Sequence, residues 1–210
     1  MRVASWFFGR KGHPYKKMEV ALSRLLATVD GIEHEAFHDK DILSSDILAT
    51  FDVLITYTQH APGKELETGE EDALFSFVES GGGFVGIHGA TASFKTNPRY
   101  HEFLGGRFTG HGLPCKIHAR VVDRDHPVTA GLGMATFSLK DEPYDHELLD
   151  ERVHVLVDRD GKRGTAPMAW IKEHGKGRIV YIAFGHYTKV LEHPAVRGLV
   201  LGAVSWATRG

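Results

Sequence analysis

The chain has 210 residues, a formal net charge of −2, 42% hydrophobic residues and 25% charged residues. This mix excludes a disordered or fibrous protein and predicts one domain over residues 1–210. The charge is too small to attract nucleic acid, and the apolar residues 1–8 are too few for a signal core or a membrane span. We therefore expect a cytoplasmic protein that binds neither nucleic acid nor a membrane.

The first half of the chain predicts strands that alternate with helices. The apolar run over residues 3–8 predicts a buried strand, and apolar residues at helical spacing over 18–29 predict a helix that Gly31 ends. Strands are then expected around residues 34–37, 53–55 and 84–87, with a helix over 73–78 before the last of them. Residues 81–83 are three glycines before a strand, whereas a phosphate loop follows its strand, so they predict a turn.

The second half predicts peripheral strands and then a further strand and helix. Alternation over residues 117–122 and the apolar run 153–157 predict half-exposed strands. Residues 179–184 predict another buried strand, and 196–207 an amphipathic helix. Strands that are apolar on both faces and alternate with helices are typical of a covered parallel sheet, so we predict an α/β fold with a doubly wound, mostly parallel sheet.

Histidines follow the predicted strands at the edge where ligands bind in such sheets. His13 follows the first strand, Gln59 and His60 follow the third, and His88 and His186 end two later strands. Imidazole serves near pH 7 as an acid, a base or a neutral metal ligand. We therefore expect a small-molecule cleft at this edge.

Three further segments carry candidate residues. Residues 86–90 end a strand in a turn of small residues, which is typical of a nucleophile elbow with His88 where Ser or Cys would stand. The glycines of residues 105–110 predict a tight loop that presents His111. Residues 141–146 form a dense polar segment that includes Asp141 and Glu142.

Five motifs in order resemble the ThuA-like family of trehalose-utilisation proteins: GGGFVGIHGAT at 81–91, YHEFLGGRFTGH at 100–111, HPVTAGL at 126–132, DEPY at 141–144 and GKGRIVYIAFGH at 175–186. The resemblance implies a flavodoxin-like fold similar to class I glutamine amidotransferases and a role in disaccharide metabolism. It marks His88, His111, Asp141 with Glu142, and His186 as shared residues. Amidotransferases carry cysteine at the elbow, whereas Cys115 lies outside this turn, so cysteine-dependent glutamine hydrolysis is not expected.

The leading hypothesis is an enzyme, a hydrolase, lyase or isomerase, that acts on a disaccharide or its keto derivative. The expected catalytic residues are His88, His111, Glu142 and His186. The expected substrate-binding residues are His13, Gln59, His60, Tyr144 and Trp170. The alternatives are a non-catalytic sugar-binding or regulatory module and a purely structural protein.

The sequence is compatible with either a metal-dependent or a metal-free site. The only cysteine is Cys115, so a metal would need histidine and carboxylate ligands. A divalent metal such as zinc, held by His88, His111 and His186 with Glu142 as a further ligand or general base, is one hypothesis. A metal-free acid and base pair built from the same residues is the other. Apolar residues on the last helix also allow a homodimer.

Overall fold

The structure is a computed structural model that describes residues 1–9, 13–59, 65–161 and 164–208. The strands of its main sheet are, in spatial order, β2 (Glu33–Phe37), β1 (Arg2–Gly9), β3 (Val53–Gln59), β4 (Gly83–Ile87), β11 (Gly177–Ile182), β10 (Gly164–His174), β9 (His154–Gly161), β6 (Cys115–Val121) and β7 (Thr136–Asp141). A second sheet pairs β5 (Gly106–His111) with β8 (Tyr144–Leu148).

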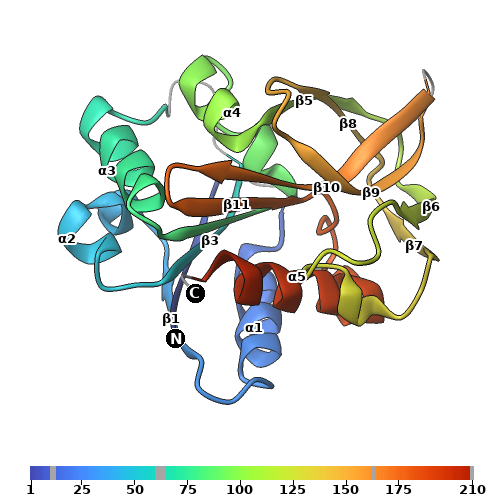
Figure 1. Cartoon of the computed structure of the whole chain (residues 1–210), viewed down its shortest axis with the longest axis horizontal. Coiled ribbons are helices and arrows are strands. Elements are labelled where there is room, and N and C mark those ends of the chain that lie inside the picture. Colours follow the sequence, from blue (N-terminus) through green and yellow to red (C-terminus); the bar gives the residue numbers. More distant parts are fainter. Residues whose placement is uncertain (10–12, 60–64, 162–163, 209–210) are drawn as a thin grey trace.

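The helices are α1 (Tyr15–Leu26), α2 (Ser45–Leu48), α3 (Thr68–Glu79), α4 (Pro98–Leu104) and α5 (Pro194–Ala207). Short 3-10 turns are η1 (Lys40–Leu43), η2 (His88–Ala92), η3 (Ala130–Leu132) and η4 (Thr188–Glu192). Helices α1 and α5 lie on one side of the parallel strands, and α3 and α4 lie on the other (Figure 1). In the described residues, no helix is long and apolar enough to cross a membrane.

Five neighbouring strands form the parallel half of the main sheet. β1 pairs in parallel with β2 and β3, β3 with β4, and β4 with β11. Every residue of β4 is buried, because helices cover both faces of this half. The strands predicted near residues 3–8, 34–37, 53–55, 84–87 and 179–184 are thus confirmed.

The other four strands form an antiparallel half. β11 pairs with β10, β10 with β9, β9 with β6 and β6 with β7, all antiparallel. The α/β prediction is confirmed, but only one half of the sheet is parallel. The predicted peripheral strands over 117–122 and 153–157 correspond to β6 and β9. No strand was predicted from the sequence for the region of β10.

Local details correct two further expectations. Helix α1 ends at Leu26, so Val29 lies outside it and is partly exposed, while Gly31 adopts a φ of +80° in the following turn. Residues 106–111, predicted as a loop, form β5. Gly81 has a φ of +112° directly after α3, which confirms the predicted turn before β4.

Candidate histidine and carboxylate site

The site is built around a strained turn at the end of β4. His88 has a φ of +50°, a left-handed conformation that costs about 1–3 kcal/mol for a residue with a side chain. A Cβ on the next residue, Gly89, would lie 2.5 Å from the carbonyl oxygen of Thr58 in β3. Only glycine therefore allows this close approach, and the turn has the shape of the predicted elbow.

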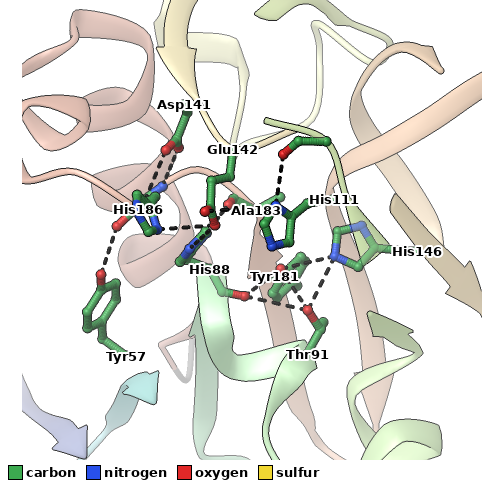
Figure 2. Close-up of polar contacts among 12 residues, drawn as sticks. Tyr57, His88, Thr91, His111, Asp141, Glu142, His146, Tyr181, Ala183 and His186 are labelled. Carbon is green, nitrogen blue, oxygen red and sulfur yellow. Dashed lines mark hydrogen bonds and ion pairs between the residues drawn. The ribbon is translucent and has the colours of Figure 1, made fainter. Parts of the chain in front are cut away.

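The imidazole of His88 is fully buried and held in one orientation. Its Nδ1 lies 2.9 Å from the carbonyl oxygen of Ala183, and because a carbonyl only accepts, Nδ1 carries the proton. Its ring stacks on Tyr144 with centroids 4.3 Å apart. The Nε2 atom on the other side of the ring points at Glu142, whose Oε2 is 3.5 Å away (Figure 2).

Glu142 lies between three imidazoles. Its Oε2 is also 3.1 Å from Nδ1 of His186, and its Oε1 is 3.8 Å from Nδ1 of His111. Burial acts to raise the pKa of Glu142, but the nearby His88, His186 and His111 outweigh it, so the pKa is lowered. Burial lowers the pKa of His186, although Glu142 opposes this shift. The ionised form of Glu142 and the neutral form of His186 are therefore favoured near pH 7.

The loop that carries His186 is fixed by a buried carboxylate from β7. Asp141 accepts the backbone N–H of Gly185 at 2.7 Å and that of His186 at 3.1 Å. From the other side, the hydroxyl of Tyr57 donates to the carbonyl oxygen of Gly185 at 2.9 Å. Burial raises the pKa of Asp141, while His88 and the two N–H donors oppose the shift. These contacts orient His186 toward Glu142 (Figure 2).

His13 completes the arrangement from the segment between β1 and α1. Its ring centroid lies 5.3 Å from that of His88 and 5.2 Å from that of His186. Ligand atoms of His13, His88, Glu142 and His186 all lie within 4.8 Å of one another, and we call these four residues the histidine cluster. Ligand atoms around a tetrahedral zinc ion are separated by about 3.3 Å, so modest closure would suit a metal. The cluster could thus hold a metal ion.

This cluster differs from the expected zinc ligands. His111 lies at the rim with 41% of its side chain exposed, and its Nδ1 donates to the carbonyl oxygen of Gly112 at 2.8 Å. The structure places His13, which the sequence assigned to substrate binding, in the position expected for His111. His88, His186 and Glu142 lie together as expected.

The remaining expected binding residues lie in different surroundings. Trp170 is fully buried, donates from Nε1 to the carbonyl oxygen of Leu104 and packs against Tyr181, so its expected role as a sugar contact is corrected to a core residue. Tyr144 is buried beneath His88. Gln59 ends β3 beside the elbow, and its Cβ would be 3.0 Å from a Cβ on Gly89. His60 lies outside the described residues.

Sequence reasoning missed a buried network behind the elbow. His146 in β8 lies 3.2 Å from the hydroxyl of Thr91 and 3.1 Å from that of Tyr181 (Figure 2). Burial lowers the pKa of His146 to about 3, so this imidazole is neutral. The polar segment 141–146 was visible in the sequence, but nothing in its pattern indicated that His146 points inward to the elbow.

The comparisons agree with this fold. A ThuA-like protein from Bacteroides uniformis superposes with a TM-score of 0.82 at 21% identity, over 99% of this chain and 91% of that one. A ThuA-like protein from Parabacteroides merdae gives 0.82 at 16%, over 99% and 89%. A GMP synthase component from Thermoplasma acidophilum gives 0.58 at 12%, over 98% and 95%.

The sequence itself has one informative match. No curated protein matches it. The profile described as "ThuA: Trehalose utilisation" matches residues 5–207, which is nearly the whole sequence. The chain therefore belongs to the ThuA family, whose description supports a role in sugar utilisation.

Proposed function

We propose that this protein is a sugar-utilisation enzyme that acts on a disaccharide or its keto derivative with a divalent metal, zinc, held in the histidine cluster. The observation that carries the proposal is the convergence of three imidazoles and one carboxylate within 4.8 Å. Catalytic zinc sites commonly use three such protein ligands and leave one position for water or substrate. In this site Glu142 would act as either the further ligand or the general base.

The residues fit acid and base chemistry on a carbonyl compound. When bound, the metal would polarise a substrate oxygen or supply a reactive water. Glu142, with its lowered pKa, is ionised near pH 7 and can accept a proton from a C–H group next to a keto group. His111 at the exposed rim can exchange a proton with the departing or newly formed hydroxyl. Isomerisation and elimination both use these two steps, and addition of water to the elimination product completes hydrolysis.

The surroundings also suit a carbohydrate. A cavity of about 620 Å³ begins at Tyr187, the residue after His186, and this tyrosine is partly exposed. Its ring lies 4.6 Å from that of His186, so a sugar ring packed on Tyr187 would reach the histidine cluster. Lys140, Lys189 and Thr188 add hydrogen-bond donors to the cavity. We propose that a second sugar unit occupies this space.

We propose that this protein has an amidotransferase-like fold but does not carry out amidotransferase chemistry. The likeness to the GMP synthase component supports that fold, but His88 stands at the elbow where amidotransferases place cysteine. Cys115 begins β6, is exposed and pairs in register with Asp141, so it does not stand at the elbow position. A cytoplasmic location and a homodimer are parts of the same proposal that follow from the sequence.

The first experiment measures metal and turnover together. Protein purified without a nickel column is analysed for bound metals, stripped with a chelator, and incubated with trehalose and keto-trehalose before and after zinc is restored. We expect stoichiometric zinc, loss of turnover on stripping and recovery on restoration. Full turnover in the stripped protein would contradict the metal and leave the His88 and Glu142 pair as the catalyst.

Matched variants separate the two possible ligand sets. His13→Ala should lose bound zinc, whereas His111→Ala should retain it, because only His13 belongs to the histidine cluster. If the protein binds sugar but no variant or condition yields turnover, the protein is a sugar-binding module.

A further inference from the structure

The carbonyl oxygen of His88 is held by a buried tyrosine. The hydroxyl of Tyr181 in β11 donates to this oxygen at 2.7 Å, and both residues are fully buried. Burial raises the pKa of Tyr181 well above its usual value, so the hydroxyl stays protonated and acts as a donor. The hydrogen bond is made at the one backbone position of the elbow that adopts the left-handed conformation.

Two neighbours, Thr91 and His146, contact the tyrosine hydroxyl. The Nδ1 of neutral His146 lies 3.2 Å from the carbonyl oxygen of Pro167 and must donate to it, which leaves Nε2 as an acceptor. The hydroxyl of Thr91 donates to the hydroxyl oxygen of Tyr181 at 2.9 Å. The tyrosine proton then has two acceptors within reach, Nε2 of His146 at 3.1 Å and the carbonyl oxygen of His88 at 2.7 Å, and it forms the shorter bond to His88.

The network links β8, β11 and the elbow in a fixed order (Figure 2). On the opposite side of the elbow residue, the ring of His88 donates to Ala183, one residue beyond β11. The backbone and the ring of His88 are therefore both tied to the β11 segment. A change in the backbone tie would rotate the imidazole relative to Glu142.

We propose that Tyr181, whose hydroxyl accepts from Thr91, is a positioning residue that holds His88 in its left-handed conformation and aims Nε2 into the histidine cluster. The proposal rests on the proposed function in that His88 is taken as a metal ligand or base. It assigns no contact between Tyr181 and substrate. Hydrogen-bonding partners behind a metal ligand commonly change metal affinity by 10–100-fold when they are removed.

The chain contains a matched control for this contact. Tyr100 is also fully buried, and its hydroxyl donates to the carbonyl oxygen of Ala90 at 3.2 Å in the same turn, η2. Tyr100→Phe and Tyr181→Phe each remove one buried hydroxyl from this turn. Only the second removes the bond to the carbonyl of His88.

The test measures the zinc Kd and the visible absorption spectrum of the cobalt-substituted protein for wild type, Tyr181→Phe and Tyr100→Phe. We expect Tyr181→Phe to weaken zinc binding by about tenfold or more and to alter the cobalt spectrum, with Tyr100→Phe close to wild type. Thr91→Val, which keeps the side-chain shape, should show a smaller change in the same direction. It serves as the reporter if Tyr181→Phe does not fold.

A second measurement keeps this proposal separate from the metal. Long-range proton to nitrogen-15 NMR on metal-free protein reports which ring nitrogen of His88 is protonated. We expect a defined Nδ1–H form in wild type and Tyr100→Phe, and a mixture of tautomers in Tyr181→Phe. If wild type binds no metal but shows this difference, the metal proposal fails and the positioning role stands. Equal behaviour of the two tyrosine variants in both experiments would overturn the positioning role.

Discussion

The parallel and antiparallel halves of the main sheet contribute different groups to the candidate site. The parallel half supplies imidazoles at or shortly after strand ends: His13 follows β1, His88 follows β4 and His186 follows β11. The antiparallel half and the small sheet supply Glu142, between β7 and β8, and His111 at the end of β5. A strand-end rule locates residues in the first half, whereas no comparable rule locates those in the second.

The largest expected effect tests the contribution of the parallel half. His88→Ala should reduce turnover by about 10²–10⁴-fold, the range typical of a positioned acid or base, because it removes the buried imidazole that faces Glu142. His111→Ala, at the exposed rim, should lose less than about tenfold. Steady-state kinetics on the keto-disaccharide measure both. A larger loss for His111 would transfer the chemistry to the antiparallel half.

Predictability from the sequence follows the same division. Covered parallel strands are continuous apolar runs, so their ends and the histidines that follow them can be identified from the sequence. β10 instead includes Pro167 and the buried Lys172, whose ammonium pairs with Asp150 at 2.8 Å, and these residues interrupt the apolar pattern. The position of Glu142 depends on how β7 and β8 pack against the elbow, a long-range contact that local patterns do not encode.

Trp170 illustrates the same limit and carries the next prediction. From the sequence, Trp170 was expected to stack on a sugar ring, but its indole lies in the core of the antiparallel half. Trp170→Phe should lower the free energy of unfolding by about 2–3 kcal/mol, because a smaller ring leaves a cavity and the carbonyl of Leu104 loses its donor. Urea denaturation measures this loss. The KM for the sugar should stay within about twofold of wild type, and a tenfold increase would restore the binding role.

The pH dependence of stability tests the buried network at the junction of the two halves. His146 has a folded pKa of about 3 against 6.5 for the free side chain. The unfolded chain therefore binds this proton first, and stability falls as the pH drops below about 6.5. At pH 5 the loss attributable to His146 is about 2 kcal/mol.

His146→Gln provides the comparison, since other buried histidines contribute to the same trend. Denaturant unfolding of metal-free wild type and variant at pH 7 and pH 5 should show a smaller decrease for the variant, by about 2 kcal/mol. Equal decreases would mean that His146 is protonated in the folded protein.

The smallest expected effect concerns Cys115. Cys115→Ser should leave turnover and thermal stability unchanged, because this exposed side chain lies outside the elbow and the histidine cluster. Alkylation of the wild-type protein with iodoacetamide gives an independent check. A loss of more than about tenfold, equivalent to about 1.4 kcal/mol of transition-state stabilisation, would restore cysteine chemistry.

The hydrogen bonds of Asp141 to the backbone of Gly185 and His186 have a consequence for biosynthesis. Asp141 and Gly185 are 44 residues apart, and His88 and Ala183 are 95 residues apart, so the site is made of contacts that close late in the chain. A nascent chain that ends before β11 lacks His186 and both of these ties. Metal would therefore stabilise the finished protein by binding its native state rather than act as a template for early folding intermediates.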